Sequence, residues 1–305
     1  MSIEAVVGSQ DFIFSTDGQR GISGCPVFAP TRAGFGNILD LSDLHPWQVP
    51  RWLDHLGGTL HDVAAAVPSV SAVNRAGDVL RALAVTPNVS TTIGPNEHGI
   101  EEIFQALDTL EAWRAAHARP LQAATMGLRS RVATMGCSQI EVSQRLERIP
   151  TIIDKLRREP GMNLGRMADI GGCRAVLRDV DEVRRVQSRY AGAAVTVRTR
   201  DYVEQPKSDG YRAVHVIVRY HGRLIEVQLR TQVQHEWAYT VESVTSRFGL
   251  DIKAGGGPRP VHDWFVAVSE AMALEEYGEP VAPELLRRVD TLRAAAQPYL
   301  QGVRR

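Results

Sequence analysis

The stretch from Asp201 to Arg212 combines an aromatic ring with flanking cations. It reads DYVEQPKSDGYR, so that Lys207 and Arg212 lie on either side of Tyr211. Gly210, just before the tyrosine, permits a tight backbone turn. A tyrosine ring in this setting can stack on a nucleobase while the cations hold phosphates. The stretch therefore favours nucleotide handling, although each cation alone could be an ordinary surface charge.

Two β-prone runs follow, Arg212 to Tyr220 and Arg223 to Arg230, and the two residues between them predict a hairpin. Counting back from the turn puts six apolar residues on one sheet face: Val214, Val216, Val218, Ile225, Val227 and Leu229. The same count puts four polar residues on the opposite face: His215, Glu226, Gln228 and Arg230. This polar face could line a site or simply face solvent, and the pattern alone leaves both interpretations open.

The elements around the hairpin must position these side chains. A helix from about Gln232 would bury Trp237 and Val241. His235 and Glu242 would then lie along its other side, which could line the same site as the polar face of the hairpin. Upstream, a short strand from 174 to 177, a helix from 180 to 190 and a strand near 195 are expected. This alternation predicts an α/β (α+β) fold in which helices pack against a mixed sheet.

Two further helices are predicted before this region. Apolar residues recur at helical steps from Ile100 to His117, and a second helix is expected from Ile140 to Arg158, where Pro160 stops it. The segment from 145 to 158 carries five basic and two acidic residues. This local positive excess suits a ligand that carries phosphate groups.

Composition limits the classes of function. The 305 residues include 35 basic and 35 acidic ones, so there is no global attraction to nucleic acid or to an anionic membrane. The three scattered cysteines form no pattern of a disulfide framework or zinc site, and nowhere do 18 apolar residues follow one another. We expect a soluble cytoplasmic protein with no membrane partner.

The two ends of the chain carry weaker signals. Residues 1–70 predict an irregular extension, in which Trp47 and Trp52 fit a short docking helix. The pair His61–Asp62 lacks the further carboxylates of a metal phosphohydrolase site and favours a cap or surface pair. Residues 251–305 predict a helical segment that packs on the main body or forms a homo-oligomer.

Three motifs, in this order, resemble those of the synthetase domain of the RelA/SpoT family. They occupy residues 169–174 (DIGGCR), 201–215 (DYVEQPKSDGYRAVH) and 226–231 (EVQLRT). The resemblance implies a nucleotidyltransferase-like domain over residues 71–250, with about five strands. It also implies transfer of pyrophosphate from ATP to the 3′-hydroxyl of a nucleotide, GDP or GTP by default, as in single-domain small alarmone synthetases.

The resemblance also implies residue roles. Asp169 and Glu226 would ligate Mg²⁺, and Glu226 would share that ion or deprotonate the attacking hydroxyl. Four cations would bind ATP: Arg145, Arg148, Lys155 and Arg174. Seven residues would bind the acceptor, with Tyr211 stacked on its base: Lys207, Tyr211, Arg212, His215, Gln228, Arg230 and His235.

Two departures from the family pattern keep other functions open. Glu147 stands where the family places a lysine, with Arg148 next to it, and the usual Glu-His-Lys after the tryptophan is absent. The acceptor could therefore be ADP, ATP or the 3′-terminal adenosine of tRNA, as in the toxin branch of the family, whose members come with an antitoxin protein. The basic segment from 145 to 158 could then bind a tRNA acceptor stem, or it could bind the phosphates of ATP alone. A third reading is a catalytically degenerate nucleotide-binding regulator, against which the retained Asp169 and Glu226 argue.

Overall fold

The structure is a computed structural model that describes residues 67–83, 97–138, 140–250, 252 and 256–300, together with the backbone of 4–7 and 12–15. The predicted helix at Trp47 and Trp52 and the pair His61–Asp62 lie outside these residues. The chain divides into two compact units. The sheet unit comprises residues 1–18, 114–147 and 166–305, and the helical unit comprises 19–113 and 148–165.

A mixed five-stranded sheet with the order β3-β4-β7-β6-β5 forms the centre of the sheet unit. Its strands are β3 (Glu141–Leu146), β4 (Gly171–Leu177), β5 (Thr196–Asp201), β6 (Val214–Tyr220) and β7 (Arg223–Thr231). Strands β4 and β7 pair in parallel, and the other neighbours pair antiparallel. This arrangement confirms the predicted mixed sheet with flanking helices. A separate antiparallel pair joins β1 (Glu4–Val7) to β2 (Phe12–Ser15).

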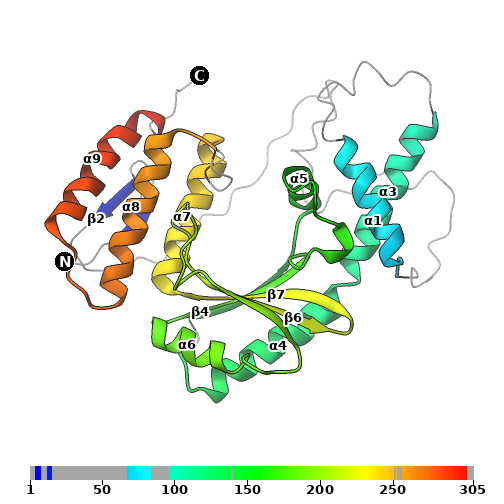
Figure 1. Ribbon diagram of the computed structural model, residues 1–305, viewed down its shortest axis with the longest axis horizontal. Helices are drawn as coiled ribbons and strands as arrows, with labels where there is room; N and C mark the ends of the chain where they lie inside the picture. Colours follow the sequence, from blue (N-terminus) through cyan, green and yellow to red (C-terminus); the bar gives the residue numbers. More distant parts are fainter. Residues whose placement is uncertain are drawn as a thin grey trace, which may run out of the picture. The chain divides into compact units, whose positions relative to one another are not determined.

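Two helices cover one face of the sheet, as Figure 1 shows: α4 (Ala118–Thr134) and α6 (Val180–Ser188). Leu121 and Leu128 of α4 and Val183 of α6 pack against the apolar residues of the strands in one core. Asp179 is the N-cap residue of α6, and its side chain accepts from the Glu182 amide, a backbone donor that a helix start leaves unpaired. The opposite face of the sheet, here called the open face, carries the polar side chains.

The hairpin register is the one predicted from the sequence. Val214 pairs with Leu229, Val216 with Val227 and Val218 with Ile225, and all six side chains are buried. His221 and Gly222 form the turn, and both have positive φ angles, as a two-residue hairpin turn of type I′ requires. The alternation of apolar and polar residues therefore predicts correctly which residues of the hairpin lie on each face of the sheet.

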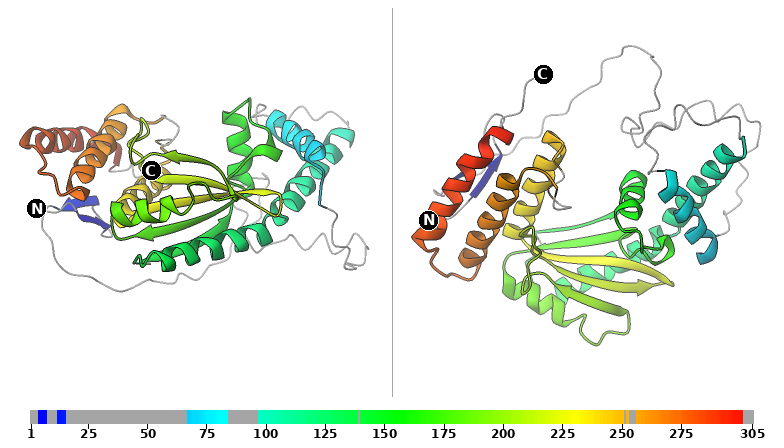
Figure 2. Two further views of the ribbon diagram at one scale, coloured as in Figure 1. Left: turned by 60° about the horizontal axis from the view of Figure 1, so that its bottom comes forward. Right: turned by 45° about the horizontal axis from the view of Figure 1, so that its top comes forward.

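Three helices follow the hairpin: α7 (Gln232–Phe248), α8 (Arg259–Glu276) and α9 (Pro283–Leu300). They lie side by side in both views of Figure 2 and bury a second apolar cluster that includes Trp237, Val241, Phe265 and Val268. The sequence predicts this helical C-terminal segment, because its apolar residues recur at helical steps. Among the described residues, no helix is long and apolar enough to cross a membrane.

The predicted helix from 140 to 158 is wrong over its first part. Residues 141–146 form the edge strand β3, and α5 (Ile149–Arg158) begins only after it. Pro150 suits the first turn of a helix but would break its interior. Val142 and Leu146 pack on the sheet core, which the alternation of a strand allows. Helix α4 was also not predicted as a separate element.

The helical unit contains α1 (Val70–Leu83), α5, the short 3₁₀ helix η3 (Leu164–Arg166) at its boundary, and most of α3 (Glu97–Ala115). Arg81 of α1 donates to the carbonyl oxygens of Leu156 and Met162. Gly77 of α1 lies so close to Leu164 that a Cβ at this glycine would be 2.8 Å from the leucine Cβ. These contacts hold α1 against α5 and the turn that follows it.

Candidate active site on the open face of the sheet

One cross-strand row runs over all five strands of the sheet. It consists of Ser143, Arg174, Gln228, His215 and Arg200, each paired in register with the next. Residues paired in this way project to the same face. This face is opposite the core, so the row forms the centre of the open face and brings cations together with hydrogen-bonding groups.

A second row lies beside it and contains Glu226. In register it reads Arg145, Gly172, Glu226, Ile217 and Arg198. Gly172 has no side chain, and a Cβ there would meet nothing closer than the Glu226 carbonyl oxygen at 3.7 Å. A Cβ at the strand position between Arg145 and Glu226 would therefore have no side-chain atom within 4 Å.

Five side chains of this region form a closed ring of hydrogen bonds. Glu226 Oε1 lies 2.9 Å from His215 Nδ1, and His215 Nε2 lies 2.6 Å from the Tyr211 hydroxyl. Arg230 Nη2 donates to the Tyr211 hydroxyl at 2.7 Å and to Gln228 Oε1 at 2.9 Å. Gln228 Nε2 closes the ring by donating to Glu226 Oε2 at 2.7 Å. Both oxygens of Glu226 are thus held by the protein.

One set of protons satisfies every bond of this ring. An ionised Glu226 accepts from Nδ1–H of a neutral His215, whose Nε2 then accepts from the Tyr211 hydroxyl. The hydroxyl oxygen in turn accepts from Arg230, which can only donate. Burial raises the pKa of Tyr211 to about 12, so the phenol keeps the proton that it donates to His215. The ring therefore holds Glu226 as an oriented carboxylate.

An aromatic and cationic cluster adjoins the ring. Tyr202, Tyr211 and His215 meet edge to face, with centroids 5.2 to 6.0 Å apart. Lys207 Nζ lies 4.7 Å from the centroids of both tyrosine rings, and Arg230 Cζ lies 5.0 Å from that of Tyr211. A base that stacks on the Tyr211 ring would replace one of these cation–π contacts with a stacking contact.

Two of the expected ATP-binding cations lie on β3 and β4 with carboxylate partners. Arg174 donates to Glu141 Oε1 at 3.0 Å and to Ser143 Oγ at 3.2 Å. Hydrogen bonds from Ser143 and from Arg174 to Glu141 lower the pKa of this carboxyl group. Arg145, whose side chain is 68% exposed, pairs with Glu147 at 3.2 Å. A phosphate would compete with these carboxylates for the guanidinium groups. Glu141 and Ser143 were missed because their segment was predicted as a helix.

The other two expected ATP-binding cations belong to the helical unit. Arg148 is the N-cap residue of α5, and Lys155 lies in its last turn with Arg157 and Arg158. Both residues interact with other groups of the chain. Their role toward ATP stays a prediction.

Asp169 lies two residues before the start of β4, at the end of the strand that carries Arg174. It is half-buried and interacts with other groups. In the part of the chain that the structure describes, no three or more His, Cys, Asp or Glu residues gather in a way that could hold a metal ion by themselves. Two carboxylates fit Mg²⁺ nonetheless, because this ion is usually bound by one or two carboxylates together with substrate phosphates and water.

Two predicted acceptor-binding residues lie apart from the ring. Arg212 is 4% exposed and pairs with Glu276 of α8. His235 lies on α7, half-buried, and its Nδ1 has no hydrogen-bond partner within the described residues. Burial lowers the pKa of His235, and the charges of Arg174 and Arg230 lower it further. His235 therefore lies within electrostatic range of the row that carries Arg174.

The site residues that the sequence alone did not indicate are Glu141, Ser143, Tyr202 and Glu276. Tyr202 was inside the quoted motif, but only its contacts with Tyr211 and His215 give it a place in the cluster. The two free cysteines described, Cys137 and Cys173, lie outside the ring. Burial raises the pKa of Cys173 to about 12, which keeps it a thiol.

Comparison with known proteins agrees with the motifs on this face. Residues 144–245 match the family model described as "Region found in RelA / SpoT proteins". An uncharacterized protein of Mycobacterium tuberculosis is 33% identical over 122 residues, which cover 38% of this chain and 43% of the relative. The GTP pyrophosphokinase YjbM of Bacillus subtilis is 30% identical over 123 residues, or 36% of this chain and 58% of the relative. The chain thus spans about half the length of the curated relatives it matches.

Two solved structures also match part of the chain. The small alarmone synthetase 1 from Bacillus subtilis, bound to its product pppGpp, is 23% identical, with 55% of this chain and 94% of that chain covered and a TM-score of 0.47. A GTP pyrophosphokinase family protein from Streptococcus pneumoniae is 21% identical, with 63% and 96% covered and a TM-score of 0.45.

Proposed function

We propose that this chain, which contains a RelA/SpoT-family region at residues 144–245, transfers pyrophosphate from ATP to the 3′-hydroxyl of a second nucleotide. The default acceptor is GDP or GTP, and the product is then an alarmone of the (p)ppGpp type. The observation that carries the proposal is the state of Glu226, a carboxylate held at both oxygens by His215 and Gln228 beside Gly172, which has no side chain.

In the proposed reaction the 3′-oxygen of the acceptor attacks the β-phosphorus of ATP. The new O–P bond forms as the bond from the β-phosphorus to the bridging oxygen of the α-phosphate breaks, and AMP leaves. Glu226 takes the proton of the 3′-hydroxyl. An in-line transfer of this kind depends mainly on positioning and on neutralisation of phosphate charge.

The residues of the open face support these roles. His215 and Gln228 fix the direction of the Glu226 carboxylate, which keeps a lone pair on each oxygen for the incoming proton or ion. Asp169 and Glu226 would hold Mg²⁺, which supplies charge neutralisation on the ATP phosphates. Arg145 and Arg174 would bind those phosphates in place of their present partners Glu147 and Glu141.

The acceptor side is proposed to centre on Tyr211. Its ring would stack on the base, while Lys207, already 4.7 Å from the ring centroid, would move to the acceptor phosphates. No observation favours guanine over adenine at this ring. ADP, ATP and the 3′ end of tRNA therefore stay alternative acceptors, and a toxin with a protein antitoxin stays the corresponding alternative function.

The test is transfer of label from ATP. We expect the purified protein with γ-labelled ATP and Mg²⁺ to label one of GDP, GTP, ADP or bulk tRNA, each offered separately. Glu226→Gln should lower the rate by a factor of about 10² to 10⁴, because an amide cannot take the proton. The control Glu284→Gln changes a carboxylate that is 74% exposed on α9 and should act like wild type.

Label on none of the four acceptors, under conditions where the protein is folded, would leave the catalytic proposal without support. Equal rates for Glu226→Gln and wild type would remove Glu226 from the reaction. In the first case the chain would be better described as a nucleotide-binding regulator, and direct ATP binding would then be measured.

A further inference from the structure

The last residue of α8, Glu276, is a buried carboxylate with three polar partners. Its side chain is 5% exposed, and so is that of Arg212, with which it forms an ion pair. The Thr231 hydroxyl donates to Oε1, and Gln234 Nε2 lies 3.5 Å from Oε2. A carboxylate this deep is stable only when donors surround its oxygens. Glu276 therefore joins three segments: the loop before β6, the end of β7 and the start of α7.

Two of the three partners of Glu276, Arg212 and Thr231, are chain neighbours of ring residues. Arg212 follows Tyr211, and Thr231 follows Arg230, while Tyr211 and Arg230 share the 2.7 Å hydrogen bond of the ring. Because adjacent Cα atoms are only about 3.8 Å apart, a clamp on residues 212 and 231 restricts both ring residues. The Thr231 side chain also accepts from the Gln234 amide as the N-cap of α7, so the clamp includes the first turn of that helix.

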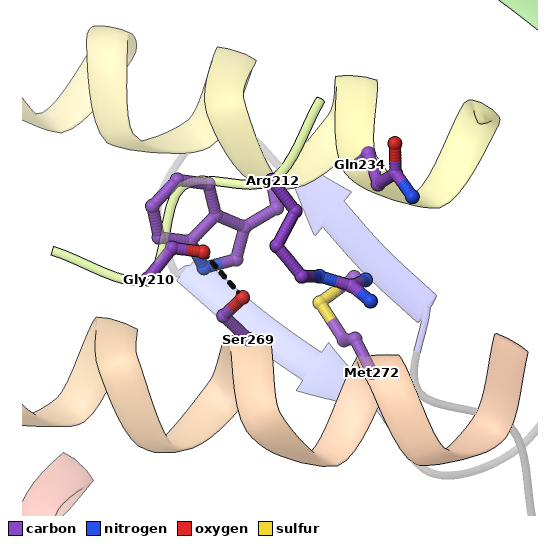
Figure 3. A pocket seen from close by; sticks show the side chains of 6 residues that line it. Gly210, Arg212, Gln234, Ser269 and Met272 are labelled. Carbon is purple, nitrogen blue, oxygen red and sulfur yellow. Dashed lines mark hydrogen bonds between the residues drawn. The ribbon is translucent and has the colours of Figure 1, made fainter. Parts of the chain in front are cut away.

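A second contact from α8 reaches the same loop. Ser269 Oγ donates to the Gly210 carbonyl oxygen at 2.5 Å, as Figure 3 shows, and Arg212 extends between α7 and α8 beside Met272. Gly210 has a φ of +88°, and a Cβ there would lie 3.1 Å from Ser269 Cβ and 3.2 Å from Trp237 Cζ2. The side chains between the Gly210 loop, α7 and α8 leave no room for a water molecule. This region is therefore a packing contact and not a ligand pocket.

We propose that Glu276 is a positioning residue for the acceptor side of the active site. It acts through Arg212 and Thr231 and sets the places of Tyr211 and Arg230. This inference rests on the proposed function for its kinetic consequence. It assigns a role in the site to α8, which begins at Arg259, after the end of the matched region at residue 245.

The primary variant is Glu276→Gln. Glutamine offers one acceptor oxygen where glutamate offers two, so Arg212 or Thr231 loses its acceptor. We expect the KM for the acceptor to rise about tenfold and the KM for ATP to stay within about twofold, since only the acceptor residues are displaced. The matched control is Glu270→Gln on the same helix, whose carboxylate is 53% exposed. It should change neither constant.

Thr231 supplies a milder pair of variants in case Glu276→Gln does not fold. Thr231→Val removes the hydroxyl that donates to Glu276 and should raise the acceptor KM. Thr231→Ser keeps the hydroxyl and should leave the acceptor KM unchanged. All variants are assayed well below their melting temperatures. An unchanged acceptor KM in folded Glu276→Gln or Thr231→Val, or an equal rise for ATP, would overturn the positioning role.

A readout without catalysis separates this inference from the proposed function. Amide hydrogen exchange should become faster at residues 210–214 and 229–231 in Glu276→Gln and stay unchanged in α6. If wild type transfers label to no acceptor, the proposed function fails, and exchange still decides the positioning role. Unchanged exchange at residues 210–214 would count against it.

Discussion

At the scale of single residues, the open face depends on a ring of five side chains joined by hydrogen bonds. The Tyr211 hydroxyl donates to His215 Nε2 and accepts from Arg230, both through its one oxygen. Glu226 only accepts and Arg230 only donates, whereas His215 donates from Nδ1 and accepts at Nε2. The orientation of Glu226 therefore depends on a phenol that is two hydrogen bonds away.

Removal of that hydroxyl should be measurable as stability. Tyr211→Phe leaves Arg230 and His215 without this partner, and we expect the free energy of unfolding at pH 7 to fall by about 1–3 kcal/mol. Urea unfolding monitored by circular dichroism gives the value. Tyr239→Phe, on a ring that is 57% exposed, is the control and should change stability little.

The pH dependence of the same variant has a definite sign. Burial raises the pKa of Tyr211 to about 12 in the folded chain, above the ordinary value of about 10. Its contribution is complete below about pH 10 and is lost as the pH rises toward about 12. The stability difference between wild type and Tyr211→Phe should shrink over that range, and a difference that grows there would contradict the assignment.

At the scale of elements, the space around a helical glycine decides whether alanine at that position stabilises or destabilises the fold. Gly77 of α1 has the side chain of Leu164 directly beside it, whereas Gly99 of α3 has nothing within 4 Å of a Cβ. Both lie in helices, where alanine is otherwise the better residue. The two positions therefore separate helix propensity from packing.

Alanine at the two positions should act in opposite directions. Gly99→Ala should raise the free energy of unfolding by about 0.5–1 kcal/mol, because glycine loses more conformational entropy on folding. Gly77→Ala should lower it by about 1–3 kcal/mol, because α1 must move away from Leu164. Thermal and urea unfolding of both variants test this, and a stabilising Gly77→Ala would disprove the close packing of α1.

At the scale of the whole molecule, the second apolar cluster holds the C-terminal helices against the element that follows the hairpin. Trp237 of α7 donates from Nε1 to the Phe265 carbonyl oxygen at 3.0 Å, and Phe265 packs against Trp264 with ring centroids 4.9 Å apart. The same cluster reaches Tyr211 at its margin. Packing between α7 and α8 and the acceptor side of the site are thus parts of one body.

Phe265→Ala should therefore cost about 3–5 kcal/mol, the usual range for a fully buried aromatic side chain. The midpoint of urea unfolding should fall accordingly, while Tyr277→Ala, at a ring that is 53% exposed, should change it little. A loss below about 1 kcal/mol for Phe265→Ala would mean that α8 contributes little to the fold.

The sequence determined those features that depend on local periodicity. The hairpin faces, the burial of Val183 and Trp237, and the set of polar residues opposite the core follow from periods of two and 3.6, which the order of residues states directly. The identity of β3 was missed because a six-residue segment is too short for its period to outweigh the helical pattern after it.

Only the tertiary structure decided the partners of the polar side chains. The motif segment presents Lys207, Tyr211, Arg212 and His215 as similar candidates for the acceptor, yet Arg212 pairs with Glu276, 64 positions away, while Tyr211 and His215 enter the ring. Polar side chains of similar reach choose their partners by how helices and strands approach one another, and spacing along the chain does not contain that information. Residue types alone predict the chemistry of the open face. Its geometry is set by the packing of β6, β7 and α8, which the sequence does not state.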